Sequence, residues 1–182
     1  MRKFRNYAYG LRTPKLFYCG MEIKQQIAKH LRQVHFGGNW TASSLKENLK
    51  GVSWQQATTK VGSLNTIAAL VYHMNYFVDA VLKVMQGMQL DAHDKFSFDL
   101  PLIQSQEDWD NLLAKSWEDA ENLASLIEQM PESKLWEDFA DARYGNYYRN
   151  LQGIIEHCHY HLGQVVIIKK MLAEGLDQPK PH

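Results

Sequence analysis

Four stretches of the chain repeat apolar residues at the spacing of an α-helix, and this periodicity limits the possible folds most strongly. In the first stretch, Ile23, Ile27 and Leu31 recur every fourth residue and so share one helical face. No stretch shows the strict alternation that is typical of a half-buried strand. The pattern predicts an all-α protein, a four-helix bundle. Its long helices are expected within residues 21–35, 63–87, 106–130 and 150–172.

The segment 39–62, between the first two of these stretches, has the pattern of short helical turns. Thr41 or Ser43 can cap one turn, and Ser53 can cap a second. Trp40 is expected either to plug a cavity at this end of the bundle or to act as a packing anchor. The segment therefore predicts a short helical crossover between helices 1 and 2.

The helical pattern defines one domain, residues 21–175, followed by a tail at 176–182. Residues 1–20 are basic and aromatic but lack the apolar stretch of a secretion signal. They are either an upstream extension or an arm that packs on the domain through Phe4, Tyr7 and Phe17.

Composition argues against several classes of partner. Twenty basic and twenty acidic residues balance, so no net charge attracts nucleic acid or an anionic membrane. No run of 18 apolar residues is present, which predicts no membrane span.

The two cysteines, Cys19 and Cys158, form no CxxC motif, a pattern typical of a reducing compartment. We expect a cytoplasmic protein, with Cys158 as a buried, inert thiol.

Three histidines fall on apolar helical faces. His157 and His161 lie one turn apart on the last stretch, with His159 on the opposite side, facing solvent or an interface. His73 lies in the middle of the apolar stripe of residues 63–87. Each could be a core histidine bonded to a carbonyl or carboxylate. Together, two ligands on one helix and a third on its neighbour would form an open three-nitrogen site, as in catalytic zinc centres.

Other polar residues have simpler interpretations. His30 and His93 are expected in solvent, His93 within a long loop at 88–105, whereas His35 can reach the interior near the end of its helix. Asn75 is expected opposite His73, on the polar side of its helix. The acidic face of residues 106–130, which includes Asp119, is expected to be solvated.

A di-iron carboxylate bundle is excluded by spacing. Such bundles carry Glu-x-x-His on two helices. Leu70, Ile154 and Cys158 stand three residues before the three histidines, where that motif needs Glu.

Aromatic and basic residues precede the last helix. They can form the entrance of a cavity that holds an anionic substrate, or they can pack over the end of the bundle. These residues are Tyr144, Tyr147, Tyr148, Arg143 and Arg149.

Four motifs together resemble the DinB-like (DinB/YfiT) superfamily of metal-binding four-helix bundles. They are GGNWTASSLKENLKGVSWQQA, NTIAALVYHMNYF, QEDWDNLLAK and YGNYYRNLQGIIEHCHYHLGQVVIIKK, and the resemblance spans residues 21 to about 172. It implies a divalent metal ion, Zn, Ni or Fe, held by His73, His157 and His161. Characterised members include bacterial S-transferases for low-molecular-weight thiols and a thiol-dependent isomerase. Members are commonly dimers, for which Val166 and Tyr148 are the candidate contacts here.

The resemblance implies an enzyme that transfers a cellular thiol to a small electrophile. A metal-dependent hydrolase is the first alternative, although Glu156 turns roughly 260° away from His157 around the helix and leaves no evident general base. The second alternative is a stress-associated bundle that binds a ligand without catalysis. Beyond the three ligands we assign no catalytic residue. Gln164, one turn after His161, is expected to orient the site, since metal-binding histidines usually donate their other N–H to a nearby oxygen.

Overall fold

The computed structural model describes residues 22–175, and its regular structure in that range is helical, apart from an isolated bridge between Asp138 and Asn146. The all-α prediction is confirmed. The long helices are α1 (Ile23–Phe36), α4 (Ile67–Met85), α5 (Gln106–Gln129) and α6 (Tyr147–Ala173). The shorter elements are α2 (Leu45–Leu49), α3 (Trp54–Thr58) and the 3₁₀ turns η1 (Asp94–Phe96), η2 (Glu132–Trp136) and η3 (Ala142–Tyr144). The predicted leader with Cys19, and the predicted tail, lie outside the described residues.

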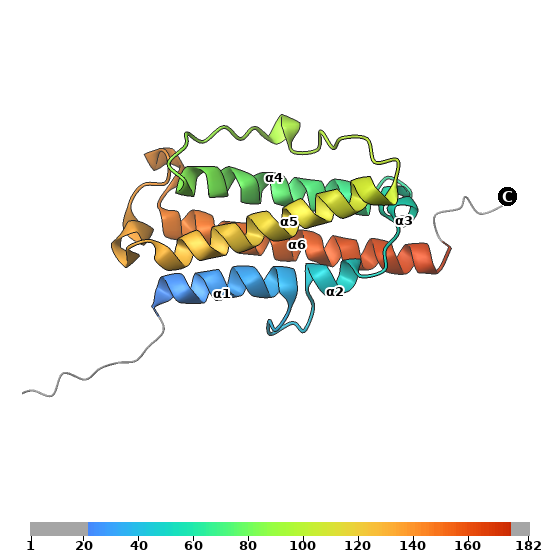
Figure 1. Cartoon of the computed structure of the whole chain (residues 1–182), viewed down its shortest axis with the longest axis horizontal. Coiled ribbons are helices and arrows are strands. Elements are labelled where there is room, and N and C mark those ends of the chain that lie inside the picture. Colours follow the sequence, from blue (N-terminus) through green and yellow to red (C-terminus); the bar gives the residue numbers. More distant parts are fainter. Residues whose placement is uncertain (1–21, 176–182) are drawn as a thin grey trace, which may run out of the picture.

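The long helices lie side by side (Figure 1). Helix α1 packs on α5 and α6, and α4 packs on the same two helices from the other side. Helices α2 and α3 occupy the connection between α1 and α4, as predicted for the crossover. One continuous apolar core links all four long helices, so burial of their apolar faces is the main source of stability.

Side-chain caps explain where most helices begin. Ser44, not Thr41 or Ser43, caps α2, since its hydroxyl accepts from the backbone N–H of Glu47. Ser53 caps α3 as predicted. Each cap satisfies a backbone donor that has no partner within the helix. The long helices α4, α5 and α6 use Thr66, Ser105 and Asn146 in the same way.

The segment 88–105 forms the predicted long loop, which we call the strap. It runs back along α4 and contains the single turn η1 (Figure 1). Tyr76 of α4 anchors it, because the Tyr76 hydroxyl accepts from the His93 backbone N–H at 2.9 Å and donates to its carbonyl at 3.2 Å. The strap is thereby held against the helix that carries His73.

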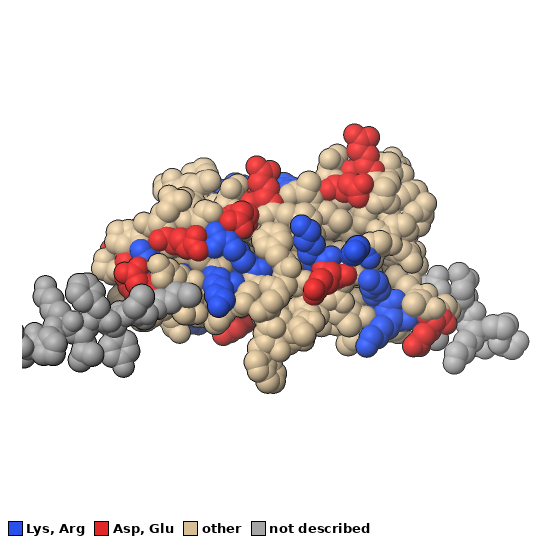
Figure 2. Space-filling view, turned by 60° about the horizontal axis from the view of Figure 1, so that its bottom comes forward, with Lys and Arg blue, Asp and Glu red and all other residues tan. Residues whose placement is uncertain are grey.

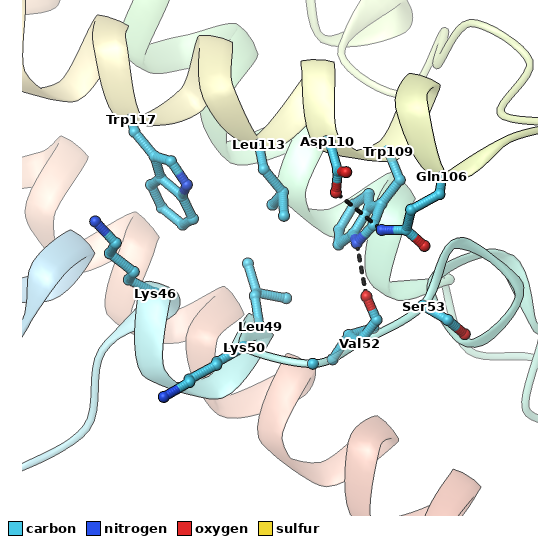
Figure 3. A pocket seen from close by; sticks show the side chains of 11 residues that line it. Lys46, Leu49, Lys50, Val52, Ser53, Gln106, Trp109, Asp110, Leu113 and Trp117 are labelled. Carbon is cyan, nitrogen blue, oxygen red and sulfur yellow. Dashed lines mark hydrogen bonds between the residues drawn. The ribbon is translucent and has the colours of Figure 1, made fainter.

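Trp40 neither plugs a cavity nor anchors the crossover, because its side chain is 99% exposed. The buried anchor is Trp109 of α5, whose indole Nε1–H donates to the Val52 carbonyl at 2.9 Å. Figure 3 shows Trp109 pointing from α5 toward the segment that follows α2. An indole that is apolar on its faces and bonded at its nitrogen suits this position.

Asn75 and Asp119 also differ from expectation. Both are buried, and the Asn75 amide donates to the Asp119 carboxylate at 2.8 Å. Lys115 donates to the same carboxylate at 2.7 Å and so compensates its charge. The prediction was wrong because α4 has two neighbours: its His73 side faces α6, and its opposite side faces α5 rather than water.

Helix α4 is long and apolar enough, by length and composition alone, to cross a membrane. However, 67% of the relevant window is buried inside the protein, as expected for the core helix of a bundle. Charged side chains of both signs are interspersed on the face drawn in Figure 2. Some of them pair across helices, as Arg32 of α1 does with Glu121 and Glu128 of α5.

Candidate metal centre

Helices α4 and α6 bring three imidazoles together. Nε2 of His157 lies 3.0 Å from Nε2 of His73, and one nitrogen of each of the three rings, including His161, lies within 4.8 Å of the others. The predicted convergence of these residues is confirmed. They lie close enough together to hold one metal ion.

The sequence explains this arrangement locally. His157 and His161 are four residues apart on α6, so one turn brings their rings together edge to face, with centroids 4.5 Å apart. His73 approaches from α4, where it lies midway along the helix that packs on α6. His73 and His161 are buried and His157 is partly buried, so the cluster lies at the wall of the core.

Two phenylalanines surround the rings. Phe98 of the strap stacks on His73 with ring centroids 4.0 Å apart and planes inclined by 10°. Phe77 meets both His73 and His157 edge to face at 5.2 Å. Nothing in the periodicity of the sequence signals Phe98, because a loop has no repeat that assigns its side chains to a face. Together these rings reduce access of water to His73.

Gln164 is bonded to the cluster as predicted. Its carbonyl oxygen Oε1 lies 2.7 Å from Nδ1 of His161, so this nitrogen carries the proton and Nε2 retains its lone pair. The same prediction is wrong for His73 and His157, whose Nδ1 atoms are buried without a hydrogen-bond partner. The backbone of Ser97 and the Asp94 carboxylate partly oppose the fall in the pKa of His73.

Burial favours the uncharged form of His73 and His157. It lowers the pKa of His157 to about 4, with further lowering from His161 and His73, and with opposition from the Asp94 carboxylate. Burial and the charge of His161 lower the pKa of His73 as well. Neutral imidazole is the form that binds metal, so protons compete weakly for these ligands at neutral pH.

Three imidazole nitrogens suit a divalent ion of borderline softness, such as zinc. Two imidazole nitrogens bound tetrahedrally to zinc at about 2.0–2.1 Å lie roughly 3.3 Å apart. The 3.0 Å contact between His157 and His73 is close to this value, whereas the 4.8 Å limit for the whole set is longer. Ring shifts of the order of one ångström therefore suffice for three-fold ligation.

A cavity of about 440 Å³ opens beside the cluster. Its walls include His73, His157, Phe98, Ile154 and, from η1, Asp94. Asp94 directly follows His93 in the loop, where the sequence predicts exposure to solvent. His93 is indeed exposed, but Asp94 also lines this cavity and raises the pKa of both neighbouring histidines. Helical spacing could not predict this position, because Asp94 lies in the strap and not on a long helix.

The remaining candidates lie apart from the cluster. His30 is exposed, as predicted. His159 is half-buried, and its pKa is lowered by burial and by the nearby His30, which places it on the α1 side of α6, away from the cluster. Cys158 is a free, buried thiol whose pKa rises to about 12 through burial, so the predicted inert cysteine is confirmed.

The tyrosines before and at the start of α6 have separate roles. Tyr147 is buried and meets Phe139 edge to face at 5.1 Å. Tyr148 packs against Trp136 with ring centroids 5.5 Å apart. Tyr144 instead lines a second cavity together with Arg149. Packing and cavity entrance, the two interpretations left open by the sequence, thus apply to different members of the group.

The bond from Gln164 to His161 predicts an effect on metal affinity. We expect Gln164→Ala to weaken Zn²⁺ binding by about 10- to 100-fold, because His161 loses the partner that fixes its tautomer. Titration against a chromogenic chelator measures this affinity. Gln152→Ala, on the same helix, is the control and should bind as the parent does. Equal affinity in both variants would show that Gln164 does not orient the site.

His35 predicts a pH dependence of stability. It is buried at the end of α1, its Nδ1 lies 2.8 Å from the Leu31 carbonyl, and burial lowers its pKa to about 4. In the unfolded chain the pKa returns to about 6.5. Between these two pKa values the unfolded state binds one more proton at His35 than the folded state does. The contribution of His35 to the unfolding free energy is therefore fully present above pH of about 6.5 and is lost as pH decreases toward 4. The loss from His35 is about 3 kcal/mol.

Urea unfolding of metal-free protein between neutral and acidic pH tests this. The slope of unfolding free energy against pH should decrease in His35→Leu by about one proton, or about 1.4 kcal/mol per pH unit. His30→Leu should retain the parent slope, because His30 is exposed. An unchanged slope in His35→Leu would mean that His35 titrates normally in the folded protein.

Comparison with known proteins assigns no family: no family model, no curated protein and no solved structure matches this chain.

Proposed function

We propose that the chain is a divalent-metal-dependent enzyme, a four-helix bundle of the DinB-like superfamily, which transfers a low-molecular-weight thiol to a small electrophile. The observation that carries the proposal is the convergence of three imidazoles, two of them with lowered pKa values, beside a cavity of about 440 Å³. Their pattern along the chain supports the family, since His73 lies on the second long helix and His157 and His161 lie on the fourth.

Three protein ligands leave coordination positions free, as catalytic sites require. A divalent ion, Zn, Ni or Fe, would supply positive charge that lowers the pKa of a thiol or a water molecule toward neutrality. The cavity beside the histidines offers the volume for a small substrate. A closed structural site would instead need a fourth side-chain ligand, and within residues 22–175 only these three residues form a suitable cluster.

The residues around the cluster support group transfer. Phe98 and Phe77 cover the rings and limit hydrolysis by water. Gln164 holds His161 in one tautomer. In the reaction, the thiol S–H bond breaks and a sulfur–carbon bond forms while a halide leaves or an epoxide opens. The thiol proton passes to solvent or to Asp94, whose carboxylate lines the cavity. With a halide this proton is released together with the halide ion, and with an epoxide a proton is returned to the oxygen of the opened ring.

Metal-dependent hydrolysis is the second candidate, and Asp94 is the observation that favours it. A hydrolase needs a base that accepts a proton from water. Asp94 occupies the wall of the histidine cavity, where such a base would act. The two reactions differ in the group added to the electrophile, which is a thiol in one and water in the other.

The experiment uses the full chain loaded with Zn²⁺, L-cysteine and either chlorodinitrobenzene or styrene oxide. Mass spectrometry of the products should show a thioether at a rate that falls to background with His157→Ala or after chelation. A hydrolysis product that forms equally well without L-cysteine would favour the second candidate. Stoichiometric metal without turnover of either electrophile would instead favour a bundle that binds ligands without catalysis.

We further propose a cytoplasmic homodimer, as the resemblance implies. The free, buried thiol of Cys158 and a thiol co-substrate both suit a reducing compartment. On α6, the exposed apolar side chains are Tyr160 and Ile167, and they are better candidates for a dimer contact than the half-buried Val166 and Tyr148. Light scattering that gave a monomer at micromolar concentration would remove the dimer.

A further inference from the structure

The cavity beside the histidines continues into a larger one. The second cavity has a volume of about 670 Å³, and Phe77, Asp94 and Ile154 line both. These shared walls make the two cavities one groove, with the histidines at one end. The groove follows α6 back toward its N-terminus, where Asn150 and Arg149 line it.

The larger cavity carries basic side chains. Arg149, Lys95 and His93 line it, together with Tyr144. Arg149 marks its far end, because it lies eight residues before His157 on α6. Within residues 22–175, neither Arg149 nor Lys95 forms a salt bridge with a carboxylate. Lys95 lies over the Phe96 ring at 4.5 Å, which leaves its charge available to an anion. The unpaired guanidinium favours a carboxylate at the far end of the groove, and the ammonium of Lys95 adds positive charge to the same cavity.

The middle of the groove is mainly apolar. Phe77, Val81, Leu90 and Ile154 contribute to it. The one carboxylate, Asp94, belongs to the part shared with the histidine cavity, where it repels an anionic group. A ligand that fits both ends therefore has an apolar body and carries its negative charge only at the end near Arg149.

Gly153 leaves space for such a body. It lines the groove one turn before His157, and a Cβ atom added there would meet nothing within 4 Å. Gly163, on the exposed side of the same helix, is equally unobstructed. A large side chain at position 153 would thus fill the groove, whereas the same side chain at position 163 would point into solvent.

We propose that this groove binds an elongated, apolar carboxylate, with its acid group at Arg149 and its opposite end at the histidines. Arg149 and His157 are eight residues apart on α6, which corresponds to about 12 Å along the helix. The ligand therefore spans roughly that length. As a substrate class the inference rests on the proposed function, but binding to the groove requires neither metal nor turnover.

Calorimetric titration of the metal-free full chain with decanoate and with its neutral analogue decanol tests the inference. Decanoate should bind more tightly than decanol. Arg149→Gln should raise the dissociation constant of decanoate about tenfold and leave that of decanol unchanged. Arg143→Gln is the matched control, because Arg143 is exposed and lies by Asp141. It should behave as the parent does.

Gly153→Leu should weaken both ligands strongly, and Gly163→Leu should weaken neither. Circular dichroism checks that all four variants remain folded. The inference is overturned if neither ligand binds, if decanol binds as tightly as decanoate, or if Arg149→Gln retains the preference for decanoate. A protein that binds Zn²⁺ but not decanoate would contradict only the groove, and one that binds decanoate but cannot bind Zn²⁺ would contradict only the metalloenzyme.

Discussion

Replacing any one of the three clustered histidines with alanine should lower Zn²⁺ affinity by more than about 100-fold, since loss of a ligand costs more than loss of a residue that only orients one. The variants His73→Ala, His157→Ala and His161→Ala each leave two nitrogens, which cannot hold the ion as three do. Competition with a chelator of known affinity measures the change. Activity that depends on metal should disappear in parallel.

His159→Ala provides the matched control, because His159 lies on the same helix but outside the cluster. It should bind Zn²⁺ as the parent does. Loss of the ion in this variant, or its retention in His157→Ala, would contradict the assignment of ligands.

The same three variants should stay folded. Nδ1 of both His73 and His157 is buried without a partner, and such groups cost free energy. Their removal can leave the metal-free variants slightly more stable than the metal-free parent. Unfolding of the variants, detected by circular dichroism, would show that the histidines are needed for the fold itself.

Trp109→Ala should have the largest effect on stability, a loss of about 3–5 kcal/mol. The indole is fully buried between α5 and the crossover, and its Nε1–H is bonded to the Val52 carbonyl (Figure 3). The variant leaves a cavity and a carbonyl without its donor. Urea unfolding at neutral pH measures the loss.

Trp40→Ala removes the same side chain from an exposed position 99% open to solvent. It should change the unfolding free energy by no more than about 0.5 kcal/mol. Similar losses in the two variants would mean that the crossover is not anchored as described.

Most of the sequence-based predictions rest on helical periodicity. Ile27 and Leu31 follow one face of α1, and both are buried. Because a histidine on an apolar stripe points where the stripe points, His73, His157 and His161 could be expected to meet. Spacing within a helix thus predicted both the helices and the cluster.

The sequence-based predictions were wrong where a neighbouring helix or a loop determines the position of a side chain. Asn75 was expected in water because a single stripe suggests a single buried side, but α4 is covered on two. Asp94 and Phe98 belong to the strap, which has no period that could aim their side chains at His73. Trp40 and Trp109 are alike in composition, and only packing distinguishes the exposed residue from the anchor.

The central claim is an open metal site in a bundle that folds without the ion, and metal analysis of the full chain tests it most directly. Protein stripped with a chelator and then dialysed against Zn²⁺ should contain one ion per chain, because three imidazoles converge on one position. Circular dichroism of the stripped protein should match that of the loaded protein, since the apolar core is continuous without the three histidines. Absence of bound Zn²⁺ would contradict the metal site, and unfolding on chelation would make the ion structural.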